Sequence, residues 1–465
     1  MIARAPGSRP RRAVRAVSLA TVAVLACLAA GAEAGVQNIP CRRPFVFRNA
    51  AVNVVVLPYE SPAEITRSGD LGTHLAGLVQ VEVLRSIAKF GSVGAVQMVG
   101  TPSECEPDLV VAKLLGQVPG AQATIGRGQG LVVVWGRFFT RDGELFVQTY
   151  CRFLRAGVDE TFDLVAREQR LSGQVSAQAF ACAPRRVTVE DLDNFERQFN
   201  RSTILRVEPS DEASGTPMRS DPFPYWISDT QGDWMKITSS SGGGQSGWIH
   251  LGGAREAWSL ARWLPELLYV EGMVGYLRYR VATQVLTPPA TPATARGPAR
   301  PQWIEEASRA LADYEQAIAL PTGTADAPAL PWRTALAGAV QLQLRGILAL
   351  TKPDATSEDR ERAATLFDRA AAAAPHDGNA RNLAALLRLA HALGAQDGPA
   401  LEQAANDLLR ALGADPGNRF LFANLRSAYQ ALSNPQAAQA LALSDERRRS
   451  YQEQLAALDK VRVAR

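Results

Sequence analysis

The first half of the chain is patterned for strands and one amphipathic helix. The β-branched run Val52–Leu57 ends at Pro58, which is typical of a buried strand. Apolar residues that recur every four positions predict a helix over residues 71–90. Further strands are expected at residues 93–99, at 131–139 and 144–154 around the turn pair Asp142-Gly143, and, more weakly, twice within 159–182. This order of elements predicts an α/β domain with a mixed sheet.

The second half is patterned for helices. From residue 303 onward, apolar side chains return at spacings of three and four, which predicts helical hairpins near 331–374, 378–412 and 418–443. Two stretches share a small residue, a bulky one, a small one and a helix-ending proline: Ala363, Phe367, Ala370 and Pro375, then Ala404, Leu408, Ala411 and Pro416. This signature resembles the second helix of tetratricopeptide repeats, which implies an all-α solenoid that binds other proteins.

The same resemblance gives positions to individual residues. The small alanines are expected at close contacts between helices, and the first helix of each pair is expected to line a concave face. Arg381 and Arg388 fall on a first helix, and we expect them on that face, where an extended peptide or a partner's helix would bind.

The α/β half also resembles a known family. Val54-Val-Val-Leu-Pro-Tyr59 and the hairpin from Val132 through Asp142-Gly-Glu-Leu-Phe-Val147 are similar to the opening strand and late hairpin of the TolB amino-terminal domain. The resemblance covers roughly 110 residues of the chain. It implies contacts with other envelope proteins and no catalysis.

Between the two halves lies a short region rich in Gly, Ser, Pro and Asp, which predicts a small all-β unit. Gly232-Asp-Trp-Met-Lys-Ile237 and Gly247-Trp-Ile249 resemble the closing strands of a bacterial SH3-like barrel. Trp234 and Trp248 fit a barrel core, because aromatic residues in strands most often serve packing. A ligand groove for a peptide or a peptidoglycan stem is the alternative role for these two side chains.

The amino terminus has the features of an export signal. A basic stretch precedes the apolar run Ala16 to Ala30, and Ala32-Glu33-Ala34 suits a signal peptidase, so the mature chain is expected to begin at Gly35. That run is shorter than the roughly 20 residues that span a bilayer. The alternative is a lipoprotein, since Val24-Leu25-Ala26-Cys27 resembles a lipobox, and only lipidation of Cys27 would place the chain on a membrane.

Four cysteines remain outside the signal, namely Cys41, Cys105, Cys151 and Cys182. An even number in an exported domain predicts two disulfides, with three pairings open. A zinc site is not expected, because no pair shows C-x2-C spacing.

Motifs of catalysis and cofactor binding are missing from the sequence. Gly126-Arg-Gly-Gln-Gly130 precedes a strand where a phosphate loop would follow one, and the chain has neither G-x-S-x-G nor H-E-x-x-H. A formal net charge of +4 over 465 residues gives no indication of nucleic-acid binding. We therefore expect no cofactor and no metal.

The sequence predicts a multidomain protein: 1–34 a signal peptide, 41–184 the α/β domain, 185–202 a helical linker, 203–252 an SH3-like β domain, 253–283 an aromatic-rich helical segment, 284–301 a Pro-rich linker, and 302–465 helical repeats. The expected function is a periplasmic or secreted adaptor that binds partner proteins. One alternative is a peptidoglycan-binding or cell-wall-regulating protein, as an outer-membrane lipoprotein if Cys27 is acylated. Another is a hydrolase with an unrecognised site in the first domain.

Overall fold

The computed structural model describes residues 39–48, 50–61, 71–188, 190–191, 204–217, 225–231, 234–239, 246–250, 264–283, 299–319, 332–435 and 443–463. The predicted signal peptide, nearly all of the Pro-rich linker and most of the 185–202 helical linker lie outside these residues. Within them, the chain has a mixed sheet in its first half and a helical region in its second half, as the hydrophobic pattern predicts.

The mixed sheet has the strand order β1-β3-β2-β4-β5-β8, with β9 also paired to β5. Its first four strands run parallel, and β5 and β8 continue the sheet antiparallel. The strands are β1 (Ile39–Pro40), β2 (Val52–Glu60), β3 (Val93–Val99), β4 (Gly130–Arg141), β5 (Glu144–Arg155), β8 (Phe180–Ala181) and β9 (Arg185–Arg186).

Both faces of this sheet are covered, which explains its continuous apolar runs. Val54 and Val56 of β2 pack in the core with α2 (Leu71–Ile87) and α6 (Glu266–Thr283), while Val55 and Leu57 pack on the opposite side with α3 (Pro107–Leu114). The helix α2 continues into a short 3-10 turn, η2 (Ala88–Phe90), so the predicted 71–90 helix is confirmed with a tighter last turn.

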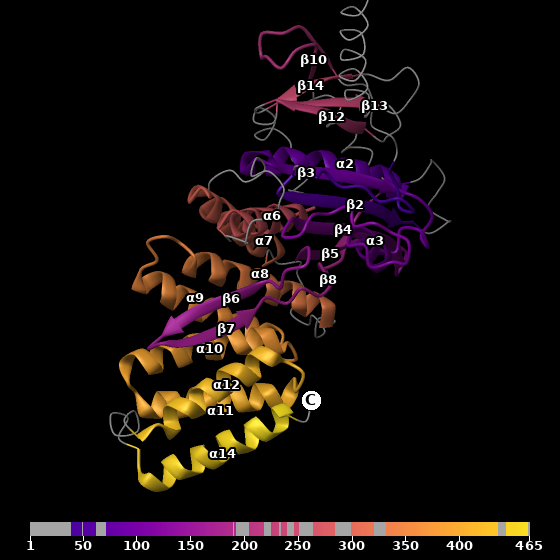
Figure 1. Cartoon of the computed structure of the whole chain (residues 1–465). Coiled ribbons are helices and arrows are strands. Elements are labelled where there is room, and N and C mark those ends of the chain that lie inside the picture. The colour runs from indigo at the N-terminus through magenta and orange to yellow at the C-terminus, as the bar shows by residue number, and fades with distance from the viewer. Residues whose placement is uncertain are drawn as a thin grey trace, which may run out of the picture.

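The middle region forms a second, antiparallel sheet of five described strands in the order β11-β10-β14-β13-β12. They are β10 (Ile204–Arg206), β11 (Gly215–Pro217), β12 (Tyr225–Gln231), β13 (Trp234–Ser239) and β14 (Ser246–His250). The two strands expected around Trp234 and Trp248 are paired with each other. The described strands form an open order, with β11 and β12 at its ends, and do not close into the expected barrel. Figure 1 places this sheet next to α2.

The described residues after the small sheet form helices that lie as antiparallel neighbours (Figure 1). The pairs are α6 with α7 (Gln302–Ala319), α8 (Trp332–Leu350) with α9 (Ser357–Ala373), α10 (Gly378–Ala395) with α11 (Gly398–Ala414), and α12 (Arg419–Ser433) with α14 (Asp445–Val463). The pairs α8–α9 and α10–α11 correspond to two of the expected hairpins, whereas the range expected for the third, 418–443, contains α12 and ends before α14 begins. Helix α6 is buried nearly all round, because it lies between the mixed sheet and the other helices, so the described part of the aromatic-rich segment belongs to a core shared by both halves.

The signature alanines of the second helices are buried, as expected. Ala363 and Ala370 on α9 are fully covered, and so is Ala404 on α11. Ala370 lies in a cluster with Ala339 of α8 and Ala380 of α10, so a small residue sits where α9 meets both neighbours.

Substitution of Ala370 by leucine is therefore expected to lower the free energy of unfolding by about 1–3 kcal/mol, because added methylenes overpack a closed contact. Urea unfolding followed by circular dichroism measures the change. Ala372→Leu is the matched control, since Ala372 is exposed on the same helix. Equal stability of the two variants would contradict the packing assigned to Ala370.

Candidate protein-binding surface

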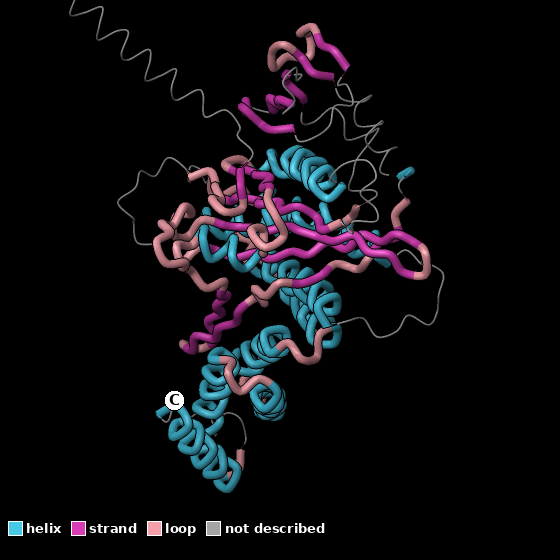
Figure 2. The backbone as a smooth tube through the Cα atoms, turned by 90° about the vertical axis from the view of Figure 1, so that its right-hand side faces the viewer, coloured by secondary structure: helices cyan, strands magenta, loops and turns pink. Residues whose placement is uncertain are grey.

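A β-hairpin leaves the mixed sheet and lies on the helices. It consists of β6 (Thr161–Ala166) and β7 (Gln169–Gln174), which form a separate two-stranded sheet among the described residues. The hairpin contacts α10 and α12 (Figures 1 and 2), and the chain just after β7 reaches α8. We call the surface formed by these three helices the first-helix face, because each is the first helix of its pair.

Three buried carboxamides of the first-helix face, Gln343, Asn382 and Asn424, contact the backbone of β7 or of the chain just after it. The Ser172 N–H donates to Asn424 Oδ1 at 3.0 Å, and the Ser172 carbonyl accepts from Asn424 Nδ2 at 2.7 Å and Asn382 Nδ2 at 3.0 Å. Asn424 Nδ2 also donates to Asn382 Oδ1 at 2.9 Å. These bonds satisfy the outer edge of β7, as a neighbouring strand would. Because these hydrogen bonds are made to backbone N–H and C=O groups, they favour an extended chain at this position whatever its side chains.

Gln343 makes the third contact, on α8. Its Oε1 accepts from the Ser176 N–H at 3.2 Å, and its Nε2 donates to Asp377 Oδ2 at 2.8 Å. The Ser176 hydroxyl donates to the same Asp377 oxygen at 2.6 Å. Burial raises the pKa of Asp377, although the hydrogen bonds from Ser176 and Gln343 act in the opposite direction. The segment from Ser172 to Ser176 thus contacts the three first helices in turn.

Apolar contacts accompany the polar ones. Leu171 of β7 is fully buried, and so is Val175, which directly follows the strand. Gly173 lies so close to Leu383 of α10 that a Cβ built there would be 2.5 Å from Leu383 Cδ2. A larger residue at this position would force the Leu383 side chain to shift, so glycine allows the strand to lie this close to α10.

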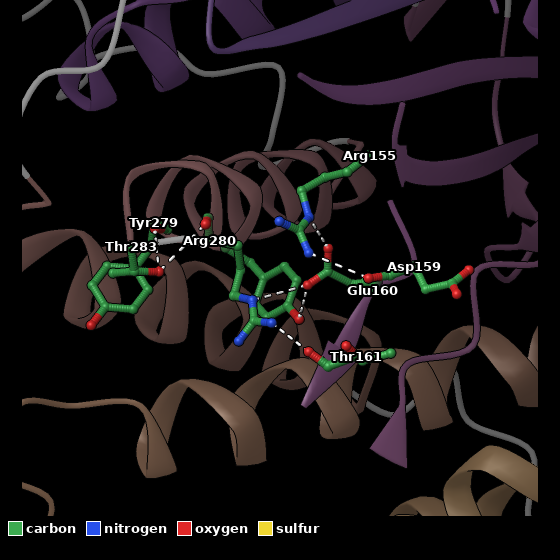
Figure 3. A network of polar contacts seen from close by, with 8 residues as sticks. Arg155, Asp159, Glu160, Thr161, Tyr279, Arg280 and Thr283 are labelled. Carbon is green, nitrogen blue, oxygen red and sulfur yellow. Dashed lines mark hydrogen bonds and ion pairs between the residues drawn. The ribbon is translucent and has the colours of Figure 1, made fainter. Parts of the chain in front are cut away.

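The root of the hairpin is fixed by a buried charge network (Figure 3). Arg155 at the end of β5 and Arg280 of α6 both point toward the Glu160 carboxylate, and both donate to it through Nε. Tyr276 donates its hydroxyl to Glu160 Oε1 at 2.8 Å, and Arg280 also donates to the Thr161 carbonyl. Burial, together with the Glu160 charge, raises the pKa of Tyr276 well above its usual range. Two cations and one anion thus hold the chain where it leaves the sheet.

The sequence analysis did not identify this surface, although the sequence carries a signal for it. Helix α8 has two carboxamide-leucine pairs, and α10 and α12 have one each. The pairs whose carboxamide bonds to the hairpin segment are Gln343-Leu344, Asn382-Leu383 and Asn424-Leu425. All six side chains are buried. The leucines form the core, and the carboxamides, one helical position earlier, face the hairpin. Buried amides at a repeat spacing indicate a shared hydrogen-bonding role.

Of the two arginines expected on the concave face, Arg388 has contacts that place it on α10. Arg388 donates to Asp407 of α11 at 2.8 Å and to Asp368 of α9, so it points to the second helices. A residue six positions after Asn382 is rotated by about 120° around the helix, so Arg388 does not share the side of α10 that holds Asn382. Arg381 precedes Asn382 by one residue and is rotated by about 100° from it.

The two predicted tryptophans lie on one face of the small sheet. Trp234 pairs with His250, and Lys236 pairs with Trp248, so these four side chains share that face. Trp248 is buried, whereas Trp234 is half-buried with its ring 4.7 Å from that of His250. Lys236 Nζ lies 6.0 Å from the Trp248 ring.

Of the four cysteines expected in disulfides, Cys41 and Cys105 are bonded, with a Cα–Cα distance of 5.0 Å. Cys151 and Cys182 are free buried thiols, which departs from the prediction of two disulfides. Cys151 pairs with Phe180, and the Cys182 N–H bonds to the Thr149 carbonyl, so the two cysteines are diagonal neighbours. Diagonal neighbours lie about 7–8 Å apart, which exceeds the usual Cα separation of a disulfide.

The two free thiols are expected to be unreactive in the folded protein. A hydrogen bond with the Cys151 thiol, and then burial, raise the pKa of Cys182 well above its usual range, and the thiolate is the reactive form. In the mature protein, which lacks Cys27, a maleimide should therefore label no thiol in the native state and two after unfolding without reductant. No label after unfolding would show a second disulfide, and four would show that Cys41 and Cys105 are not bonded.

Among the described residues, no group of three or more His, Cys, Asp or Glu side chains is placed to hold a metal ion. None of the helices within the described ranges is long and apolar enough to cross a membrane. Comparisons of the chain with protein-family models, with curated proteins and with solved structures gave no match.

Proposed function

We propose that the protein is an exported, non-enzymatic adaptor of the cell envelope. Its helical pairs, which we assign to tetratricopeptide-like repeats, bind extended segments of partner proteins on the first-helix face. The β-sheet around Trp234 and the TolB-like α/β domain supply further contact surface.

One observation carries the proposal: the first-helix face already holds an extended segment. Asn382 and Asn424 bond to the peptide group of Ser172, and Gln343 bonds to that of Ser176. Contacts to backbone atoms give affinity for any strand of suitable shape, while the adjoining pockets select side chains. A surface that satisfies an extended backbone is suited to binding peptides.

The test uses the full chain as immobilised bait in bacterial envelope extract. The double variant Asn382→Leu with Asn424→Leu should lose specific captured proteins, and Arg388→Ala should retain them because Arg388 faces the second helices. Circular dichroism melts confirm that each bait is folded. If the folded double variant captures the same proteins as the wild type, partner binding belongs to another surface.

A peptidoglycan-binding role is the second candidate, and the small sheet favours it. Trp234 is half-buried beside His250, and Lys236 lies on the same face, so an aromatic ring and a cation are both available to a ligand there. Sedimentation of the full chain with isolated sacculi tests this role. Binding that Trp234→Ala abolishes would favour it over the adaptor.

Export makes a separate prediction. The mature protein should begin at Gly35, because Ala32-Glu33-Ala34 is a suitable cleavage site after a short apolar run. Intact-mass spectrometry of the exported protein measures the new amino terminus. An amino terminus at an acylated Cys27 would instead show that the protein is a lipoprotein.

A further inference from the structure

The segment on the first-helix face is part of the protein's own chain. It has the sequence Leu171-Ser-Gly-Gln-Val-Ser176. The first-helix face contacts four features of this segment. It hydrogen-bonds to the peptide group of Ser172 and to the hydroxyl of Ser176, and it lies close to Gly173, which has no Cβ. The side chains of Leu171 and Val175 are buried. Any extended segment with these features would make the same contacts.

The hairpin that presents this segment has a turn of unfavourable composition. Its two turn residues, Arg167 and Glu168, have φ values of 43° and 66°. A two-residue turn with both φ values positive favours Asn-Gly, because other side chains are strained there. An isolated two-stranded hairpin is only marginally stable, so β6–β7 depends on its contacts with the helices. Val165, beside the turn, leaves 78% of its surface exposed.

We propose that the β6–β7 hairpin is an internal ligand, and that a partner's extended segment of the pattern Leu-Ser-Gly-x-Val-Ser binds the first-helix face in its place. This inference rests on the proposed adaptor function and names the class of its partner. The hairpin competes for the face from within the same chain, so it sets a threshold of affinity that a partner segment must exceed.

Two variants shift this competition in opposite directions. Gly173→Val places a branched side chain against Leu383 and should release the hairpin from the face. Arg167→Asn with Glu168→Gly supplies the favoured turn and should hold the hairpin more firmly. A fluorescein-labelled peptide with the sequence of residues 169–177 is the probe, and fluorescence polarisation gives its Kd for each full-length protein.

The release variant is expected to bind the peptide at least tenfold more tightly than the wild type, and the turn variant at least threefold more weakly. Asn424→Leu in the release background should abolish binding, and Arg388→Ala there should not. A peptide N-methylated at the position of Ser172 should not bind, because it lacks the N–H that Asn424 accepts.

Three results would overturn the proposal: no binding to a folded release variant, equal binding to the turn variant and the wild type, or binding that is indifferent to Asn424. If the release variant does not fold, the wild type decides. Excess peptide should accelerate amide hydrogen exchange across residues 161–174, and unchanged exchange would reject displacement. Capture from envelope extract that depends on Asn382 and Asn424 would still support the adaptor if the peptide fails.

Discussion

Replacement of Glu160 by alanine is expected to lower the free energy of unfolding by about 3–5 kcal/mol. The carboxylate is buried, and it accepts hydrogen bonds from Arg155, Arg280 and Tyr276. Its loss removes the anion that both arginines contact in a region that excludes water, which is the costly way to break a buried ion pair. Urea unfolding, monitored by tryptophan fluorescence and circular dichroism, measures the effect.

Two controls separate buried charge from other causes. Asp163→Ala removes an anion of the same hairpin, but its partner Arg170 leaves 74% of its side-chain surface exposed, so the loss should stay below about 1 kcal/mol. The triple variant Glu160→Leu, Arg155→Met and Arg280→Met removes all three charges, and it should recover much of the stability that Glu160→Ala loses. If Glu160→Ala costs no more than Asp163→Ala, the network does not hold the hairpin.

Local pattern predicted the long strands, most of the helices and one turn, although it did not predict α3. The pair Asp142-Gly143 adopts φ values of 54° and 77°, as a tight hairpin between β4 and β5 requires. The prolines Pro375 and Pro416 follow the ends of α9 and α11, because proline cannot continue a helix. These features depend only on residues that are close together in the sequence, so the sequence alone was sufficient to predict them.

The packing of elements distant in the chain was not predictable in the same way. The alternation within residues 161–174 is the same for a strand of the main sheet and for a hairpin on the helices. The partner that decides between them, Asn424, lies 252 residues after Ser172. Closure of the small sheet likewise depends on long-range pairing, and the described strands do not show it.

The second disulfide was predicted wrongly and the carboxamide contacts were not predicted, for different reasons. Counting cysteines gives the number of possible bonds but not the register that makes Cys151 and Cys182 diagonal neighbours. The Gln-Leu and Asn-Leu dipeptides were visible, but an isolated amide in a helix is ordinarily exposed. Their role becomes apparent only in the structure, where three first helices each direct one carboxamide at the same segment, Ser172 to Ser176.

Replacement of Asn424 by leucine is expected to lower the free energy of unfolding by about 2–5 kcal/mol, because it leaves two buried groups unpaired. The Ser172 N–H loses its acceptor, and Asn382 Oδ1 loses its donor, while the Ser172 carbonyl keeps its bond from Asn382. Ala423→Leu, at the exposed neighbouring position of α12, controls for helix propensity.

A double-mutant cycle with Asn382→Leu then measures how the two carboxamides act together. Because Asn382 and Asn424 bond to each other and share the Ser172 carbonyl, the double variant should cost less than the sum of the single variants, with a coupling of about 0.5–3 kcal/mol. Additive losses would mean that the two side chains act independently. Coupling would show that the first-helix face holds the strand as one unit, which a competing peptide must replace as a whole.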